Sequence, residues 1–168
     1  MTATDVRARF LDARVFAGTG RPEEAWRAVR EILEADPRHL GALLLKASLL
    51  NEDRRWEEAL AVNEQAAALW PRSAEALNAL ARALHAAGRD AEALARAEEA
   101  KGLLGEPDNA RHASAVYLTL VWCLREMRRY PEALAVAEEG LERAPDAILA
   151  QWATQVQDEY AESQKERC

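Results

Sequence analysis

The feature that most constrains this chain is a short pattern that returns four times. Each copy has an arginine, two further residues, and then glutamate, alanine and a large apolar side chain. The copies are residues 21–26, 55–60, 89–94 and 129–134. Their alanines stand at positions 25, 59, 93 and 133, so the spacings are 34, 34 and 40 residues. A spacing near 34 predicts an array of helix-turn-helix repeats.

The composition between these markers is typical of helices. Ala, Leu, Glu and Arg dominate, while the 7 glycines and 6 prolines fall at regular places. No stretch alternates apolar and polar residues with a period of two, so strands are not expected. We therefore predict an all-α fold. A chain of 168 residues fits one domain, and we expect a single domain over residues 1–168.

The repeats resemble the tetratricopeptide repeat in the positions of their large and small residues. The fourth repeat matches at Tyr117, Leu120, Val121, Leu124, Ala133, Ala137, Gly140 and Pro145. The resemblance implies an α-solenoid of about four repeats in a right-handed superhelix, with boundaries near 6–39, 40–73, 74–113 and 114–146. A further helix over 147–166, with an apolar stripe at Ile148, Leu149, Trp152, Val156 and Tyr160, is expected to cap the array. The alternative is that this stripe docks a second copy of the chain.

The turns within the repeats suggest where the backbone is left-handed. Gly20 and Gly88 can adopt the left-handed conformation that ends a helix. Arg54 and Arg128 stand at the same place in the other repeats, so those turns must close without glycine. The longer spacing of 40 residues arises within residues 102–113. We expect the flanking helices to lengthen around a turn near 105–109, and a protruding functional loop is the alternative.

The resemblance also implies a binding surface. In tetratricopeptide proteins the first helix of each pair lines a concave groove that holds a segment of another protein. The matching positions mix arginines, apolar residues and amides that can bond a peptide backbone. They predict a partner with carboxylates and an apolar anchor. An alternative is that the arginines only pair with neighbouring glutamates. The candidate residues are Arg7, Phe10, Arg14, Leu44, Ser48, Asn51, Asn78, Arg82, His85, Leu118, Trp122 and Arg125.

The sequence gives little support for functions other than protein binding. The net charge of −7 argues against a nucleic-acid partner. No apolar run could insert in a membrane. The three histidines lie far apart, and neither a phosphate-binding loop nor a nucleophile elbow occurs, so we expect no metal, no cofactor and no enzyme. Cys123 lies on a core-forming helix and Cys168 is expected to be free, which favours a reducing, cytoplasmic location.

Three functions follow from these patterns. The leading one is a non-enzymatic scaffold or adaptor that binds a peptide segment of a partner protein in the groove. A structural protein that forms homo-oligomers through the ends of the array is the alternative. A secretion chaperone of the tetratricopeptide type is similar in size and acidity, although those usually have three repeats. The clamp that reads acidic chaperone tails is missing, because Phe10 and Arg14 occupy the places of its Lys and Asn.

Overall fold

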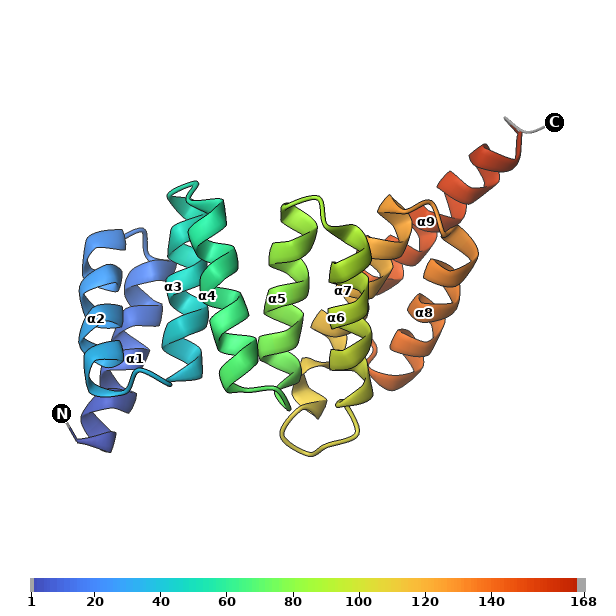
Figure 1. Ribbon diagram of the computed structural model, residues 1–168. Coiled ribbons are helices and arrows are strands. Elements are labelled where there is room, and N and C mark those ends of the chain that lie inside the picture. Colours follow the sequence, from blue (N-terminus) through green and yellow to red (C-terminus); the bar gives the residue numbers. More distant parts are fainter. Residues whose placement is uncertain (1, 166–168) are drawn as a thin grey trace. The chain divides into compact units, whose positions relative to one another are not determined.

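The computed structural model describes residues 2–165, and all regular structure in this range is helical (Figure 1). The predicted all-α solenoid of helix-turn-helix repeats is confirmed. The chain divides into two compact units, with the boundary between Pro71 and Arg72. Unit 1 holds α1 (Ala3–Gly18), α2 (Pro22–Ala35), α3 (Leu40–Glu52) and α4 (Trp56–Leu69). Unit 2 holds α5 (Ala74–Ala86), α6 (Asp90–Gly102), the 3-10 helix η1 (Ala110–His112), α7 (Ala113–Glu126), α8 (Tyr130–Arg143) and α9 (Ala147–Lys165).

Each repeat is a pair of helices that pack against each other through alanines. In unit 1, α1 packs on α2 and α3 packs on α4. Ala13 and Ala25 are fully buried where the first pair meets, and Ala59 is fully buried in the second pair. Because a methyl side chain occupies little space, the two backbones approach closely and larger residues such as Ile32 and Leu49 fill the space around them. The repeated alanine thus fixes the distance within a pair.

The repeated Arg and Glu form the same local structure at the start of every second helix. The arginine is the N-cap residue, and its guanidinium donates to the glutamate three residues later at 2.5 to 3.0 Å. The four pairs are Arg21–Glu24, Arg55–Glu58, Arg89–Glu92 and Arg129–Glu132. The hydrogen bond from the arginine lowers the pKa of each glutamate below its ordinary value. The carboxylate also lies at a helix N-terminus, where the dipole favours negative charge.

The turn before each of these arginines needs a left-handed residue. Gly20 and Gly88 have φ of 69° and 73°, as predicted. Arg54 and Arg128 occupy the equivalent positions with φ of 60° and 55°. A side chain with a Cβ is strained in this region, so the two arginines accept the conformation that the repeat geometry demands.

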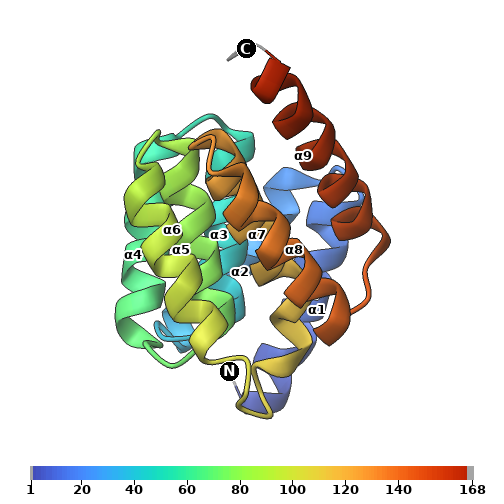
Figure 2. The same ribbon diagram turned by 90° about the vertical axis from the view of Figure 1, so that its right-hand side faces the viewer.

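Unit 2 has a core built around Tyr117, which is fully buried on α7. Gly140 of α8 lies at the centre of this core, because a Cβ there would come within 2.7 Å of Tyr117 and of Leu149. The absence of a side chain at Gly140 lets α7, α8 and α9 meet. Leu149 and Val156 of α9 are fully buried, so α9 covers the last helix pair and the predicted cap is confirmed (Figure 2). Residue 166 of the predicted helix, and Cys168, lie outside the described residues.

The link between α6 and α7 corrects one expectation. α6 has 13 residues and α7 has 14, as in the other pairs, so neither helix lengthens. The extra residues all lie in the connection over 103–112, which Figure 1 shows in yellow as a projecting loop with η1 at its end. The helices keep their length because the repeat packing determines it, whereas a connection can grow at little cost in free energy.

This loop is tied to the start of α5 within the same unit. Asn109 is 6% exposed, and its Oδ1 accepts a hydrogen bond from the Ala74 amide at 3.0 Å. Its Nδ2 donates to the Arg72 carbonyl oxygen at 3.0 Å. Arg72 also forms an ion pair with Glu106, and Leu104 is buried. The loop therefore has a structural role: it holds the start of α5 against the rest of unit 2.

Candidate functional site

The predicted groove residues of unit 1 lie on α1 and α3, which are in contact. Arg7 and Arg14 are exposed, and neither forms an ion pair with another described residue. Phe10 is half-buried: its ring lies 5.0 Å from that of His39, and a Cβ on Gly41 would overlap it. Phe10 is therefore held in place against the beginning of α3. Leu44 and Asn51 are half-buried, and Ser48 is exposed.

Unit 1 thus offers an apolar patch beside two available guanidinium groups. Phe10 and Leu44 supply the apolar surface. Arg7 and Arg14 can each bind both oxygens of a carboxylate.

The predicted residues of unit 2 lie on α5 and α7, which also touch. Arg82 is exposed and has no ion pair within residues 2–165, while Leu118 is half-buried. Asn78 is only 6% exposed, and its Oδ1 has no hydrogen-bond partner among the described residues. A buried acceptor without a donor costs about 1–3 kcal/mol, which makes Asn78 an unusual residue.

His85 and Trp122 are engaged within unit 2. The Nδ1 of His85 is 2.6 Å from Oδ1 of Asp90, and the ring centroids of His85 and Trp122 are 3.9 Å apart. The centroid of Trp152, on α9, is 6.4 Å from that of Trp122 in an edge-on arrangement. The indole of Trp122 is therefore packed between a ring of α5 and a ring of α9, and only part of it faces solvent.

Arg125 is also occupied by α9. Its Nε lies 3.0 and 2.8 Å from the two carboxylate oxygens of Glu159, and its Nη2 lies 2.5 Å from Oε1. The hydrogen bonds from Arg125 lower the pKa of Glu159. The alternative, in which groove arginines only pair with glutamates of the same chain, therefore holds for Arg125. Arg7, Arg14 and Arg82 have no such partner in the described part of the chain.

Trp152 and Glu159 are the residues that sequence reasoning did not place at this site. The sequence predicts that both lie on the capping helix and does not indicate a contact with the groove positions. A signal was present, because Glu159 follows Arg125 by 34 residues, which is one repeat length. α9 therefore lies where the first helix of a further repeat would lie, and it contacts two of the predicted groove positions of α7, Trp122 and Arg125.

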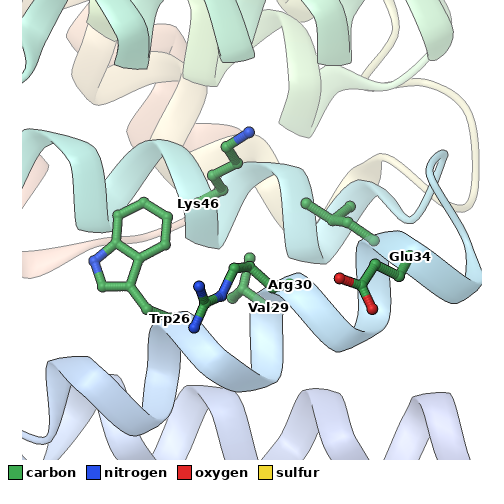
Figure 3. Close-up of a pocket in the computed structure, with 6 residues that line it drawn as sticks. Trp26, Val29, Arg30, Glu34 and Lys46 are labelled. Carbon is green, nitrogen blue, oxygen red and sulfur yellow. The ribbon is translucent and has the colours of Figure 1, made fainter.

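A second concave feature lies on unit 1, between α2 and α3. It is a pocket of about 250 Å³ lined by Trp26, Val29, Arg30, Leu33, Glu34 and Lys46 (Figure 3). Trp26 closes one side, and its Nε1 donates to Asp53 at 3.2 Å. The sequence pattern does not indicate this pocket, because a large residue after the repeat alanine is expected in the core.

The other titratable groups of the described residues do not form a reactive or metal-binding site. Burial raises the pKa of the Cys123 thiol to about 11, so this thiol is protonated at neutral pH and unreactive. No three His, Cys, Asp or Glu side chains within the described ranges come together as metal ligands would. Within residues 2–165, no helix has the length and apolar character needed to span a membrane.

Comparison with known proteins agrees with this geometry. The family model of the tetratricopeptide repeat matches residues 10–71 and 54–105. No curated protein sequence matches the chain. The fold is similar to that of pilF from Pseudomonas aeruginosa, with 22% identity over 94% of this chain and 75% of that one and a TM-score of 0.77.

Two further solved structures share the fold. A thermophilic TPR protein of Thermus thermophilus is 22% identical over 90% of this chain and 80% of its own, with a TM-score of 0.74. The MamA protein is 22% identical over 96% of this chain and 88% of its own, with a TM-score of 0.67. The stacked helix pairs, the phase of their alanines and the match of the family model lead to one conclusion: the chain belongs to the tetratricopeptide repeat family.

Proposed function

We propose that this protein is a non-enzymatic adaptor that binds an acidic peptide segment carrying an apolar anchor. Tetratricopeptide domains generally bind other proteins or peptides and generally act as scaffolds without catalysis. The observation that carries the proposal is that the exposed arginines at predicted groove positions, Arg7 and Arg14 in unit 1 and Arg82 in unit 2, have no ion pair among the described residues. Each of these guanidinium groups can bind both oxygens of a carboxylate from outside the chain.

The apolar part of the proposed site comes from residues that are already held in position. Phe10 packs on His39 and Gly41, and Leu44 and Leu118 are half-buried. An anchor side chain that covers such residues gains roughly 25 cal/mol per Å² of apolar surface removed from water. Because the side chains are fixed beforehand, little rotamer entropy is lost on binding. We place Arg125 outside the primary contacts, since Glu159 holds its guanidinium.

The test is a selection of peptides followed by a charge reversal. A random-peptide display library is selected on the purified chain, and a fluorescent copy of the enriched peptide is titrated with wild type and with Arg82→Glu. We expect enrichment of Asp or Glu together with Leu, Phe or Trp. We expect Arg82→Glu to weaken binding roughly tenfold or more, because an attractive pair becomes repulsive.

A matched variant controls for net charge. Arg96→Glu makes the same charge change on α6, where Arg96 pairs with Glu99 at the surface. We expect this variant to bind the peptide nearly as wild type does. Equal binding by wild type and Arg82→Glu, or failure to enrich any peptide, would refute the proposal. Trp122→Ala is a poorer test because its ring supports the packing between α5 and α9.

A cytoplasmic location also belongs to this proposal. It is supported by the cysteine count, since two cysteines far apart in the sequence do not make the disulfide framework typical of small secreted domains.

A further inference from the structure

The outer face of α1 carries an apolar stripe that no described helix covers. Thr4, Ala8, Leu11 and Val15 follow one another at intervals of four, three and four residues, and all four are exposed. Leu11 is 54% exposed and Val15 is 58% exposed. Intervals of this kind place side chains on one side of a helix and are the spacing of a heptad seam.

The repeat itself shows what this face does elsewhere in the protein. The residues one repeat length after Leu11 and Val15 are Leu45 and Leu49 of α3. Leu49 is 1% exposed, and both leucines pack in the core that contains Ile32 of the preceding helix pair. The equivalent residues of α7, Thr119 and Cys123, are 3% and 0% exposed. This face is therefore a packing face in later repeats.

Charged residues flank the stripe with a different sign on each side. In heptad notation the stripe occupies positions a and d, Arg7 and Arg14 occupy g, and Asp5 and Asp12 occupy e. Arg7 and Arg14 have no ion pair among the described residues. Asp5 is used in the capping box with Thr2.

Asp12 is only loosely held within its own chain. Its carboxylate lies 3.9 Å from Arg9, and the main partner of Arg9 is Glu31 at 2.7 Å. Asp12 can therefore pair with a group from outside.

We propose that this face binds the same face of a second copy of the chain, with the two α1 helices parallel. In a parallel pair a g residue lies opposite the e residue five positions later in the other helix. Arg7 then meets Asp12 of the partner subunit, and the twofold axis repeats the contact. An antiparallel pair would instead bring arginine toward arginine. Ala8 and Leu11 of both copies then meet between the two ion pairs, and Val15 meets its counterpart one turn further along.

The other end of the array is a poor occupant of this face. The exposed positions of α9 carry polar residues such as Gln151, Thr154 and Asp158, and Ile148 is its one exposed large apolar residue among those described. A head-to-tail contact would bury Leu11 and Val15 against amides and carboxylates without partners. The charge pattern of α1 is complementary to itself, so the second copy is the occupant that fits.

Sedimentation equilibrium tests the proposal on the whole chain, over concentrations from about 1 µM to about 1 mM. We expect the wild type to move from monomer toward dimer. We expect Arg7→Glu and Asp12→Lys each to raise the dimer dissociation constant at least about tenfold, because each places like charges opposite each other twice. An equimolar mixture of the two variants should associate again. In the mixed dimer the carboxylate introduced at position 7 meets the ammonium introduced at position 12, and the native Arg7 meets the native Asp12.

Controls separate this result from misfolding and from the peptide site. Circular dichroism checks that each variant keeps the helicity of wild type, and Arg38→Glu, a change on the exposed loop before α3, should dimerise as wild type does. If the wild type stays monomeric over the whole concentration range, the proposal is wrong. The exposed face of α1 would then be a surface for a different protein. Stronger association of Arg7→Glu, or no recovery in the mixture, would also overturn the proposal. The sedimentation experiment contains no peptide, so failure of the peptide selection leaves its outcome unchanged.

Discussion

Asn63 and Asn78 are both buried asparagines, yet their surroundings differ. The Nδ2 of Asn63 donates to the Ala59 carbonyl oxygen at 2.9 Å. The Oδ1 of Asn78 is enclosed without a donor in the described residues, although Asn78 lies at a groove position of α5. Functional sites often contain a buried polar group that lowers the stability of the free protein. Under the proposed function, Asn78 would link stability and binding within one residue.

We expect Asn78→Leu to stabilise the free protein while it weakens peptide binding. Leucine has a similar shape and removes the unpaired acceptor, so the free energy of unfolding should rise by about 1 kcal/mol. Urea denaturation measures this change, and the fluorescence titration of the selected peptide measures the loss of affinity.

Asn63→Leu is the matched control, because it removes a hydrogen bond that is made. It should lower the free energy of unfolding by about 0.5–1.5 kcal/mol. If both leucine variants destabilise the protein to the same degree, then the Asn78 amide is paired in solution and the argument fails.

At the scale of elements, α9 occupies part of the predicted binding surface of unit 2. Its Trp152 packs on Trp122 and its Glu159 holds Arg125, so α9 contacts two of the twelve predicted site residues. The long connection between α6 and α7 has a comparable structural role, since Asn109 bonds the first turn of α5. Both elements come from segments outside the regular repeat, and both reduce the surface available to a partner.

The ion pair between Arg125 and Glu159 makes the attachment of α9 depend on pH. The pKa of Glu159 is lowered from 4.5 in the folded protein by Arg125. The stabilisation is therefore complete above the ordinary pKa of glutamate and disappears as the pH falls through the lowered value. We expect the difference in unfolding free energy between wild type and Glu159→Gln to shrink as the pH falls from about 7 to about 3.

Tryptophan near-ultraviolet circular dichroism provides a second readout, because Trp122 and Trp152 touch across α7 and α9. Its signal should weaken in acid along with the stability difference. A difference in unfolding free energy that stays constant over this pH range would contradict the assignment.

At the scale of the whole molecule, each of the two units has a core of its own. Leu49 is 1% exposed within the first, and Leu120 is fully buried within the second. In repeat arrays the stability is close to a sum of terms from each repeat and its direct neighbours. A defect in one unit should therefore act mainly on that unit.

We expect Leu49→Ala to cost about 2–5 kcal/mol and to speed amide hydrogen exchange chiefly in α1–α4. Leu120→Ala should do the same chiefly in α5–α9. Hydrogen exchange with mass spectrometry resolves the two halves of the chain. Equal acceleration over all helices by either variant would show one cooperative structure instead.

Much of the fold is predictable because it is local and repeated. The phase of Ala25, Ala59, Ala93 and Ala133 indicates the helix pairs, and Gly20 and Gly88 indicate two of the turns. The apolar stripe at Leu149 and Val156 indicates the cap. These features depend on helix periodicity and backbone preference, which act over a few residues and can be read in order along the chain.

The remaining features depend on which side chains meet across helices. The sequence alone determined that the chain folds as stacked helix pairs and that arginines and apolar residues share the first helix of each pair. Only the tertiary structure decided that Arg125 is bound by Glu159, that Trp122 is packed between His85 and Trp152, and that the additional residues before α7 form a loop. Such contacts are chosen by the distance and direction between separate elements, and no periodicity in a single helix encodes them.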